Sequence, residues 1–348
     1  MLHNPAGSPP ADRAYPVQEL CRRYSFEEVA YLRWHGRLPS PEQLTAQNRA
    51  ERAQRALEPA VAGPLAAQPP TADPVATLRT AVRLIGTSDE AAGDNSVAAV
   101  RAKALRLVAA LPTVIAADQR RRHGLGAVAP RTDLGYAANL LYMTFGKVPE
   151  PQIVRAFETS LILYAEHNPI APAFAGPVVG ATYPDLYTAV AAAIGGLPVP
   201  PQAGTGQTVI DMMNEVGILD NAKPWLDEAL ASGRKLPGFG YRGAKDGDPR
   251  VPAMRTALGM VCAVRGGQDL LDVYEALAEA MFEARGLRPS LDYAAVPAYH
   301  LIGFDAGTVA QLGVAARLPD WTAWIAADHL DRTLAAQAGP AGRLPQQE

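Results

Sequence analysis

Apolar residues recur three and four positions apart along most of this chain, and this periodicity is the feature that most constrains its fold. Runs of alternating β-branched residues, which would indicate strands, are almost absent. Stretches rich in alanine and leucine between proline and glycine residues suit helices of about 10 to 20 residues. The pattern predicts an all-α protein, with helices over residues 25–35, 73–85, 96–111, 136–144, 151–167, 187–194 and 270–285.

Two irregular segments separate predicted helices. Residues 58–74 are rich in alanine and proline and lead directly into an amphipathic pattern, so we interpret them as a loop between helices rather than a linker between domains. Residues 88–95 have the acidic and glycine content of a surface turn. The chain shows no internal repeat.

Length and charge narrow the classes of function. The chain has 348 residues, which exceeds the size at which one core usually stops growing, so we expect two domains or a large obligate oligomer. Apolar residues make up 48% of the chain and the formal net charge is −3, which leaves no basic stripe for a nucleic acid. We therefore expect no nucleic-acid partner.

The cysteines and the N-terminal residues indicate the compartment. Cys21 and Cys262 lie far apart and lack CxxC or histidine-rich neighbours, so we expect neither a disulfide framework nor a metal site. Residues 1–13 lack an apolar core of signal-peptide length, and no run approaches about 18 apolar residues. We expect a cytoplasmic protein without a secretory or membrane segment.

Four segments carry specific motifs in a fixed order. They are L-I-L-Y-A-E-H-N-P-I-A-P (161–172), T-Y-P-D-L-Y through A-G-T-G-Q (182–207), K-L-P-G-F-G-Y-R-G-A-K-D-G-D-P-R (235–250) and S-L-D-Y-A-A (290–295). Their order and spacing resemble the citrate synthase family, and residues 15–48 are most similar to its 2-methylcitrate synthase branch. The resemblance covers roughly residues 15–330, and several motifs in order carry more weight than any single signature.

The resemblance implies a two-domain helical fold and a reaction. The small domain, which closes over the substrates, would span residues 203–297, and the large domain would take residues 1–202 and 298–348. Members of the family condense an acyl-CoA with a 2-oxo acid, so the co-substrate is a coenzyme A thioester and no cofactor is tightly bound. A homodimer is expected, and a heteromer with a paralogue that has all the catalytic residues is an open alternative.

In this family an aspartate removes a proton from the α-carbon of the acyl-CoA, and a histidine donates a hydrogen bond to the enolate oxygen. A second histidine polarises the ketone of the 2-oxo acid. The aspartate matches Asp292 in S-L-D-Y-A-A. The competing interpretation of Asp292 is structural, because Ser290 or Asp292 would cap a helix that begins at Tyr293.

Both histidine positions carry replacements. Gln202 stands where the enolate-stabilising histidine is expected, and glutamine keeps an N–H donor but cannot exchange a proton near neutral pH. Tyr241 follows G-F-G in place of the ketone-polarising histidine, and a phenol is a competent donor and an occasional general acid. Gln202 is explained equally well as a polar loop residue left after loss of activity. Tyr241 is larger and more apolar than imidazole and would fill space used by oxaloacetate, so a changed substrate and a blocked pocket are both open.

The residues expected to bind the carboxylated substrate are retained. His167 matches a substrate contact, although Tyr164 replaces a histidine that the family commonly has. Arg250 and Arg317 match positions whose guanidinium groups bind the carboxylates of the oxo acid, where planar bidentate geometry favours arginine. The alternatives are a structural role for His167, a turn for Arg250 and an ion pair for Arg317.

The coenzyme A thioester would lie along the loop from Lys235 to Gly240. In the family the glycine-rich backbone, here Gly238 and Gly240, runs beside the adenine and pantetheine groups. Arg242 and Lys245 would meet phosphates, although such residues are common on any loop.

Two hypotheses follow from these residues. The first is an acyl-CoA condensing enzyme that uses Asp292 as its base. The second is an inactive relative of the family that binds a ligand and serves as a regulatory or partner subunit. Retention of Asp292 and of both arginines favours the enzyme, because random decay would not obviously spare them.

Overall fold

Capping side chains set the starts of several helices. Helix α3 (Phe26–His35) begins with a capping box between Ser25 and Glu28, in which each side chain accepts from the other residue's backbone N–H. It ends at Gly36, whose φ of 69° is left-handed and favours glycine. Helix α6 (Pro74–Thr87) begins at Asp73, whose carboxylate accepts from the N–H of Ala76 at 2.6 Å. Local sequence therefore determines where these helices begin and end.

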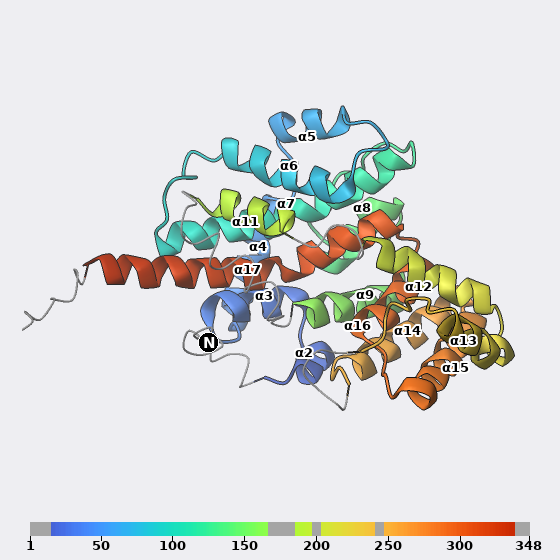
Figure 1. The fold of residues 1–348 in the computed structure, drawn as a ribbon. Coiled ribbons are helices and arrows are strands. Elements are labelled where there is room, and N and C mark those ends of the chain that lie inside the picture. Colours follow the sequence, from blue (N-terminus) through green and yellow to red (C-terminus); the bar gives the residue numbers. More distant parts are fainter. Residues whose placement is uncertain (1–14, 166–184, 197–202, 241–246, 338–348) are drawn as a thin grey trace, which may run out of the picture.

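The computed structural model describes residues 15–165, 185–196, 203–240 and 247–337 (Figure 1). Over these residues the chain forms helices and no strand, apart from an isolated bridge between Phe239 and Pro289, which confirms the all-α class. The remaining helices are α2 (Val17–Arg23), α4 (Pro41–Ala53), α5 (Pro59–Ala66), α7 (Val97–Arg122), α8 (Tyr136–Phe145), α9 (Pro151–Tyr164), α11 (Leu186–Gly195), α12 (Ala203–Val216), the 3-10 turn η1 (Leu219–Asn221), α13 (Ala222–Ala231), α14 (Val251–Arg265), α15 (Gln268–Arg285), α16 (Leu291–Ile302) and α17 (Ala306–Gln337).

The interpretation of residues 58–74 as a loop was wrong, because they contain α5. Proline at the first helical position suits a helix start, and Val61 and Leu65 are buried by packing of α5 against α6 and α7. The helix predicted over residues 96–111 also continues, through Pro112, to Arg122. Burial of Leu107, Leu111 and Ile115 stabilises α7 enough to offset the hydrogen bond that a proline removes.

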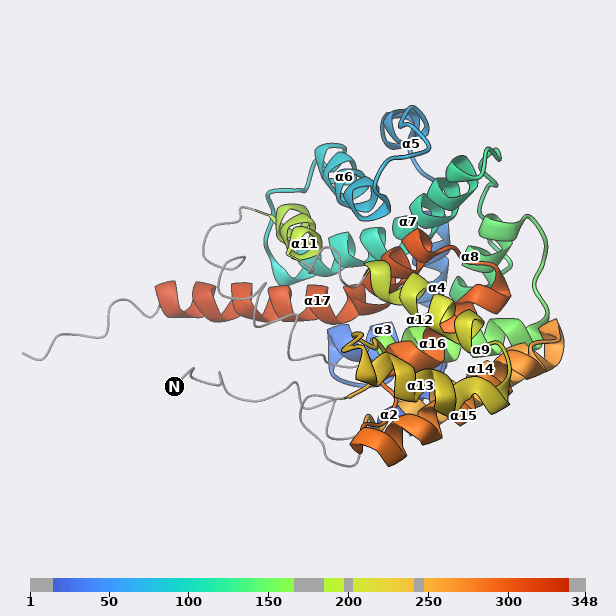
Figure 2. The ribbon, with the colours of Figure 1, turned by 45° about the vertical axis from the view of Figure 1, so that its right-hand side comes forward.

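The long helices α7 and α17 form the centre of the molecule and pack against each other (Figure 1). Helices α3, α6, α9, α11 and α12 also pack against α17. Helices α13, α14 and α15 lie together at one end, seen from a second side in Figure 2, where α14 packs on α9 and α16. The predicted small domain begins at the first residue of α12, and its predicted end, residue 297, falls at Pro297 inside α16. The two-domain division stays a prediction.

A buried ion pair fastens the end of α4 to the segment before α8. Arg55 is 1% exposed, and its guanidinium donates to both carboxylate oxygens of Glu51. The same group donates to the carbonyl oxygens of Arg131 at 2.6 Å and Leu134 at 2.9 Å. Four acceptor oxygens thus surround one buried cation.

In the part of the chain that the structure describes, no helix has the combined length and apolar character that a membrane span requires.

Candidate active site

Asp292 lies in the first turn of α16 and not at its cap. The helix begins at Leu291, and Ser290 occupies the cap position without a side-chain capping bond, so the start expected at Tyr293 was two residues late. The Asp292 side chain is exposed, and its Oδ1 accepts a hydrogen bond from the hydroxyl of Tyr164 at 2.5 Å. The carboxylate is therefore directed at another helix rather than at the N–H groups of its own helix.

Tyr164 is the last residue of α9, which packs against α16. Its side chain is buried, with 6% of the residue exposed, and only the hydroxyl end reaches Asp292. The pKa of Tyr164 is raised well above its usual value, mainly by burial and next by the neighbouring Asp292 carboxylate. The phenol keeps its proton at neutral pH and acts as a donor to Asp292.

Arg317 approaches the same place from α17. Its guanidinium carbon lies 5.0 Å from the centroid of the Tyr164 ring, and Nη1 donates to the carbonyl oxygen of Gly313 at 2.8 Å. Among the residues that the structure describes, Arg317 forms no ion pair, so the alternative of an ion-pair role finds no partner there. Asp292, Tyr164 and Arg317 thus form one cluster built from three helices. The binding of a substrate carboxylate by Arg317 stays a prediction.

The glycine-rich loop is tied to the segment that leads into α16. The N–H of Gly240 donates to the carbonyl oxygen of Arg288 at 2.9 Å, and the N–H of Ser290 donates to that of Gly238 at 2.8 Å. Gly238 and Gly240 have φ angles of 94° and 87°, which side chains other than glycine rarely adopt. These bonds bring the G-F-G motif beside the residues that immediately precede Asp292.

Gly238 also lies directly against Tyr293, the residue after Asp292. A Cβ atom placed on Gly238 would be 2.9 Å from Cδ2 of Tyr293, which is fully buried. The Tyr293 ring cannot move easily, because its hydroxyl donates to the carbonyl oxygen of Tyr274 and its ring centroid lies 4.6 Å from that of Phe239. Glycine is therefore required at position 238 by both backbone conformation and space.

Gly238→Ala is expected to lower the free energy of unfolding by about 2–5 kcal/mol, the sum of a positive-φ penalty and an overpacking penalty. Urea denaturation followed by circular dichroism measures this change. Gly233→Ala is the matched control, since Gly233 has a φ of 69° but a Cβ there meets nothing within 4 Å. Equal losses in the two variants would show that the contact with Tyr293 is unimportant.

Arg250 is engaged in a local turn. It precedes α14, and its Nε and Nη2 donate to the two carboxylate oxygens of Asp248 at 2.9 and 2.8 Å. The N–H of Arg250 also donates to Asp248 Oδ1 at 3.0 Å. This geometry is the one expected of the turn alternative. A bidentate pair that holds the guanidinium in place is also compatible with a substrate contact, which stays a prediction.

The structure describes only some of the residues of the predicted site. Lys235 is exposed and Gly238 and Gly240 contribute backbone, as described above. The other predicted residues lie outside the described residues, and they are His167, Gln202, Tyr241, Arg242 and Lys245.

Sequence reasoning did not identify the partner of Asp292. Tyr164 was noted as a replacement within L-I-L-Y-A-E-H, but nothing in the motif indicates that its hydroxyl reaches a residue 128 positions away in the sequence. Tyr299 of α16 was also missed, and its buried hydroxyl donates to Ser160 Oγ of α9 at 2.9 Å. Both tyrosines join α9 to α16, and the signal was their place on the buried faces of these helices.

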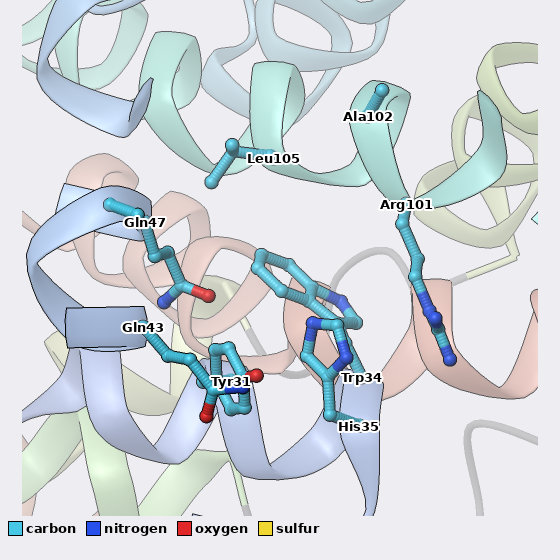
Figure 3. A pocket seen from close by; sticks show the side chains of 9 residues that line it. Tyr31, Trp34, His35, Gln43, Gln47, Arg101, Ala102 and Leu105 are labelled. Carbon is cyan, nitrogen blue, oxygen red and sulfur yellow. The ribbon is translucent and has the colours of Figure 1, made fainter. Parts of the chain in front are cut away.

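A pocket of about 340 Å³ lies elsewhere, between α3, α4 and α7 (Figure 3). Trp34 and His35 on α3 face Leu105 on α7, and Arg101 lies at the edge of the pocket. None of the residues that line the pocket belongs to the cluster around Asp292. The pKa of His35 is lowered mainly by burial and also by the charges of Arg101 and Arg37.

In the described part of the chain no group of three or more His, Cys, Asp or Glu side chains is arranged to hold a metal ion.

Comparison with known proteins supports the family resemblance that these motifs indicate. The family model described as "Citrate synthase, C-terminal domain" matches residues 11–334. The chain is 44% identical to the 2-methylcitrate synthase of Mycobacterium tuberculosis strain H37Rv over 336 residues, which cover 95% of this chain and 85% of that protein. It is 44% identical to the citrate synthase of Mycolicibacterium smegmatis over 331 residues, which cover 94% and 88% of the two chains.

A solved structure shares the fold. The citrate synthase of Pyrobaculum aerophilum superposes with a TM-score of 0.83 at 29% sequence identity, over 97% of this chain and 87% of that chain. The matching model, the sequence relatives and the shared fold agree along nearly the whole chain. The chain therefore belongs to the citrate synthase family.

Proposed function

We propose that this protein condenses an acyl-CoA with a 2-oxo acid and releases free coenzyme A, with Asp292 as the base. Membership of the citrate synthase family supports the reaction class, since the similar relatives are named 2-methylcitrate synthase and citrate synthase. No tightly bound cofactor takes part, and the coenzyme A thioester is a co-substrate.

The observation that carries the proposal is the convergence of family motifs on Asp292. The motif 161–172 contributes Tyr164, the G-F-G loop is bonded to residues 288–290, and α17 contributes Arg317. Packing between distant motifs is not required by local sequence, so their meeting around the start of α16 supports a common site.

Chain connectivity supports roles for the candidates outside the described residues. Tyr241 follows Gly240, and His167 follows Tyr164 by three positions. Gln202 directly precedes α12, which packs against α16 and α17. Each of these three residues thus lies within three positions of an element that contacts α16 or the segment leading into it.

In the proposed reaction Asp292 removes a proton from the α-carbon of the acyl group, and the electron pair of the C–H bond passes into an enolate. The Gln202 amide donates to the enolate oxygen, where a positioned donor stabilises developing charge. Tyr241 orients and polarises the ketone that the enolate attacks. Hydrolysis of the resulting thioester releases coenzyme A and leaves a carboxylate.

The binding groups are proposed by the same matches. His167, Arg250 and Arg317 would hold the carboxylated partner, with arginine suited to planar carboxylates. Lys235, Arg242 and Lys245 would hold the phosphates of the coenzyme A thioester, and the backbone at Gly238 and Gly240 would lie beside its pantetheine chain.

The assembly and location are part of this proposal. We propose a cytoplasmic homodimer whose small domain, residues 203–297, closes over the substrates. Cys21 and Cys262 are buried and form no disulfide among the described residues, which agrees with a reducing compartment. Light scattering of the purified protein measures the oligomeric state, and mass spectrometry of the complex isolated from its own cells would detect a paralogue as partner.

The test is thiol release by the purified protein over a grid of acyl-CoA esters and 2-oxo acids. The grid crosses acetyl-, propionyl- and longer acyl-CoA with oxaloacetate, pyruvate and 2-oxoglutarate. We expect turnover of at least one pair, and silence across the grid would contradict the proposal. The comparisons give no support to the alternative of an inactive ligand-binding subunit, which predicts binding without turnover.

A second measurement distinguishes a pocket that has lost only its two catalytic histidines from a pocket whose other residues have changed as well. The double variant Gln202→His, Tyr241→His restores both family histidines. A large gain in synthesis of citrate or 2-methylcitrate would show that the histidine losses limit the rate. No gain would show that the pocket has adapted to the two replacements.

A further inference from the structure

Asp292 has one side-chain hydrogen-bond partner among the described residues, and it is a tyrosine from another helix. The Tyr164 hydroxyl donates to Oδ1 at 2.5 Å, which lies at the short end of the usual range for an O–H donor to a carboxylate. The Asp292 side chain is exposed and lies one residue into α16 from its start. An exposed aspartate rotates readily about χ2, so this bond selects one orientation of the carboxylate.

Tyr164 is itself held on several sides. The residue is 6% exposed, and the Arg317 guanidinium lies over its ring at 5.0 Å from the centroid. Arg317 is held in turn by its bond to the carbonyl oxygen of Gly313. Because burial keeps the phenol protonated, the hydroxyl is a constant donor at neutral pH. A donor that cannot move or lose its proton fixes the group that accepts from it.

We propose that Tyr164 is a positioning residue for the base Asp292, holding Oδ1 so that Oδ2 is the oxygen that takes the proton from the acyl group. This role rests on the proposed function, since it concerns the same proton transfer. The C–H bond of the acyl α-carbon breaks, an O–H bond forms at Oδ2, and the electron pair remains with the enolate. Tyr164 exchanges no proton in this step.

Tyr164→Phe removes the hydroxyl and keeps the ring that Arg317 covers. We expect kcat to fall about tenfold to a hundredfold, the usual effect of misplacing a reacting group by about an ångström, while KM for the acyl-CoA changes by less than about twofold. We also expect a larger primary isotope effect on kcat with an acyl-CoA deuterated at the α-carbon, because proton removal becomes slower relative to other steps. A loss of folded protein would lower kcat without changing the isotope effect.

Tyr187→Phe is the matched control. Tyr187 is also buried, and its hydroxyl also donates to an aspartate, Asp89, at 2.5 Å, but it lies on α11 away from the cluster around Asp292. Its pKa is raised by burial and by the Asp89 hydrogen bond, as expected for a phenol beside a carboxylate. We expect this variant to keep the wild-type kcat and isotope effect, so that any loss specific to Tyr164→Phe reports on Asp292.

The outcomes separate this role from the function on which it rests. An active wild-type protein with an unchanged kcat and isotope effect in Tyr164→Phe would overturn the positioning role and leave the condensation reaction standing. A wild-type protein silent over the whole grid would overturn the reaction and this role together. Lower kcat with a larger isotope effect in Tyr164→Phe alone supports the role.

Discussion

Asp292→Asn is expected to lower kcat for thiol release by about two to four orders of magnitude, the usual contribution of a general base. Asparagine keeps the size of the side chain and its place in the first turn of α16, but its amide cannot accept the acyl proton. The Tyr164 hydroxyl can still donate to the amide oxygen, so the protein should fold normally. Steady-state kinetics on the most active substrate pair measures the effect.

Asp269→Asn is a closely matched control for this change. Asp269 is the second residue of α15, as Asp292 is of α16, and both side chains are exposed. Each substitution removes a negative charge near a helix N-terminus, which costs about 0.3–1 kcal/mol of stability. We expect Asp269→Asn to retain full activity. Full activity in Asp292→Asn as well would leave the proton transfer to another group and refute the assignment of the base.

Arg55→Met is expected to lower the free energy of unfolding by about 3–5 kcal/mol, as is usual when one partner of a buried ion pair is removed. Methionine keeps much of the apolar stem and loses the cation. Glu51 is then left as a buried carboxylate, and the carbonyl oxygens of Arg131 and Leu134 lose their donor. Urea denaturation at neutral pH measures the change.

The pH dependence of this loss has a definite sign. Burial raises the pKa of Glu51 even beside Arg55, and removing the cation raises it further, so the variant takes up a proton on folding at mildly acidic pH. The difference in stability between wild type and Arg55→Met should therefore shrink as the pH falls. Adding Glu51→Gln should recover part of the loss at neutral pH, because no buried charge is then left unpaired.

Arg49→Met provides the control for Arg55→Met. Arg49 is exposed and lies on α4, the helix that carries Glu51 and ends two residues before Arg55, so its substitution should change stability by no more than about 0.5 kcal/mol. A loss of similar size at both positions would attribute the effect to the exchange of arginine for methionine as such and not to the buried pair.

Local sequence was sufficient for much of the helical framework. The start of α3 follows from Ser25 and Glu28, and the start of α6 from Asp73 and the proline after it, because capping depends on residues within one turn. The same reasoning failed at α5 and at Pro112 of α7. In both places burial against neighbouring helices stabilises a helix that the local pattern of alanine and proline does not favour.

The sequence by itself determined the all-α class and the family, since periodicity and motif order are properties of the chain, and it indicated Asp292 as a candidate base, which stays a prediction. Only the tertiary structure decided that Asp292 faces Tyr164, that Arg317 covers the Tyr164 ring, and that the G-F-G loop is bonded beside α16. These contacts join residues more than 45 positions apart, from Gly240 to Arg288 and beyond, and depend on how α9, α16 and α17 pack. Packing is set by the summed shape of many side chains, so no single motif specifies it.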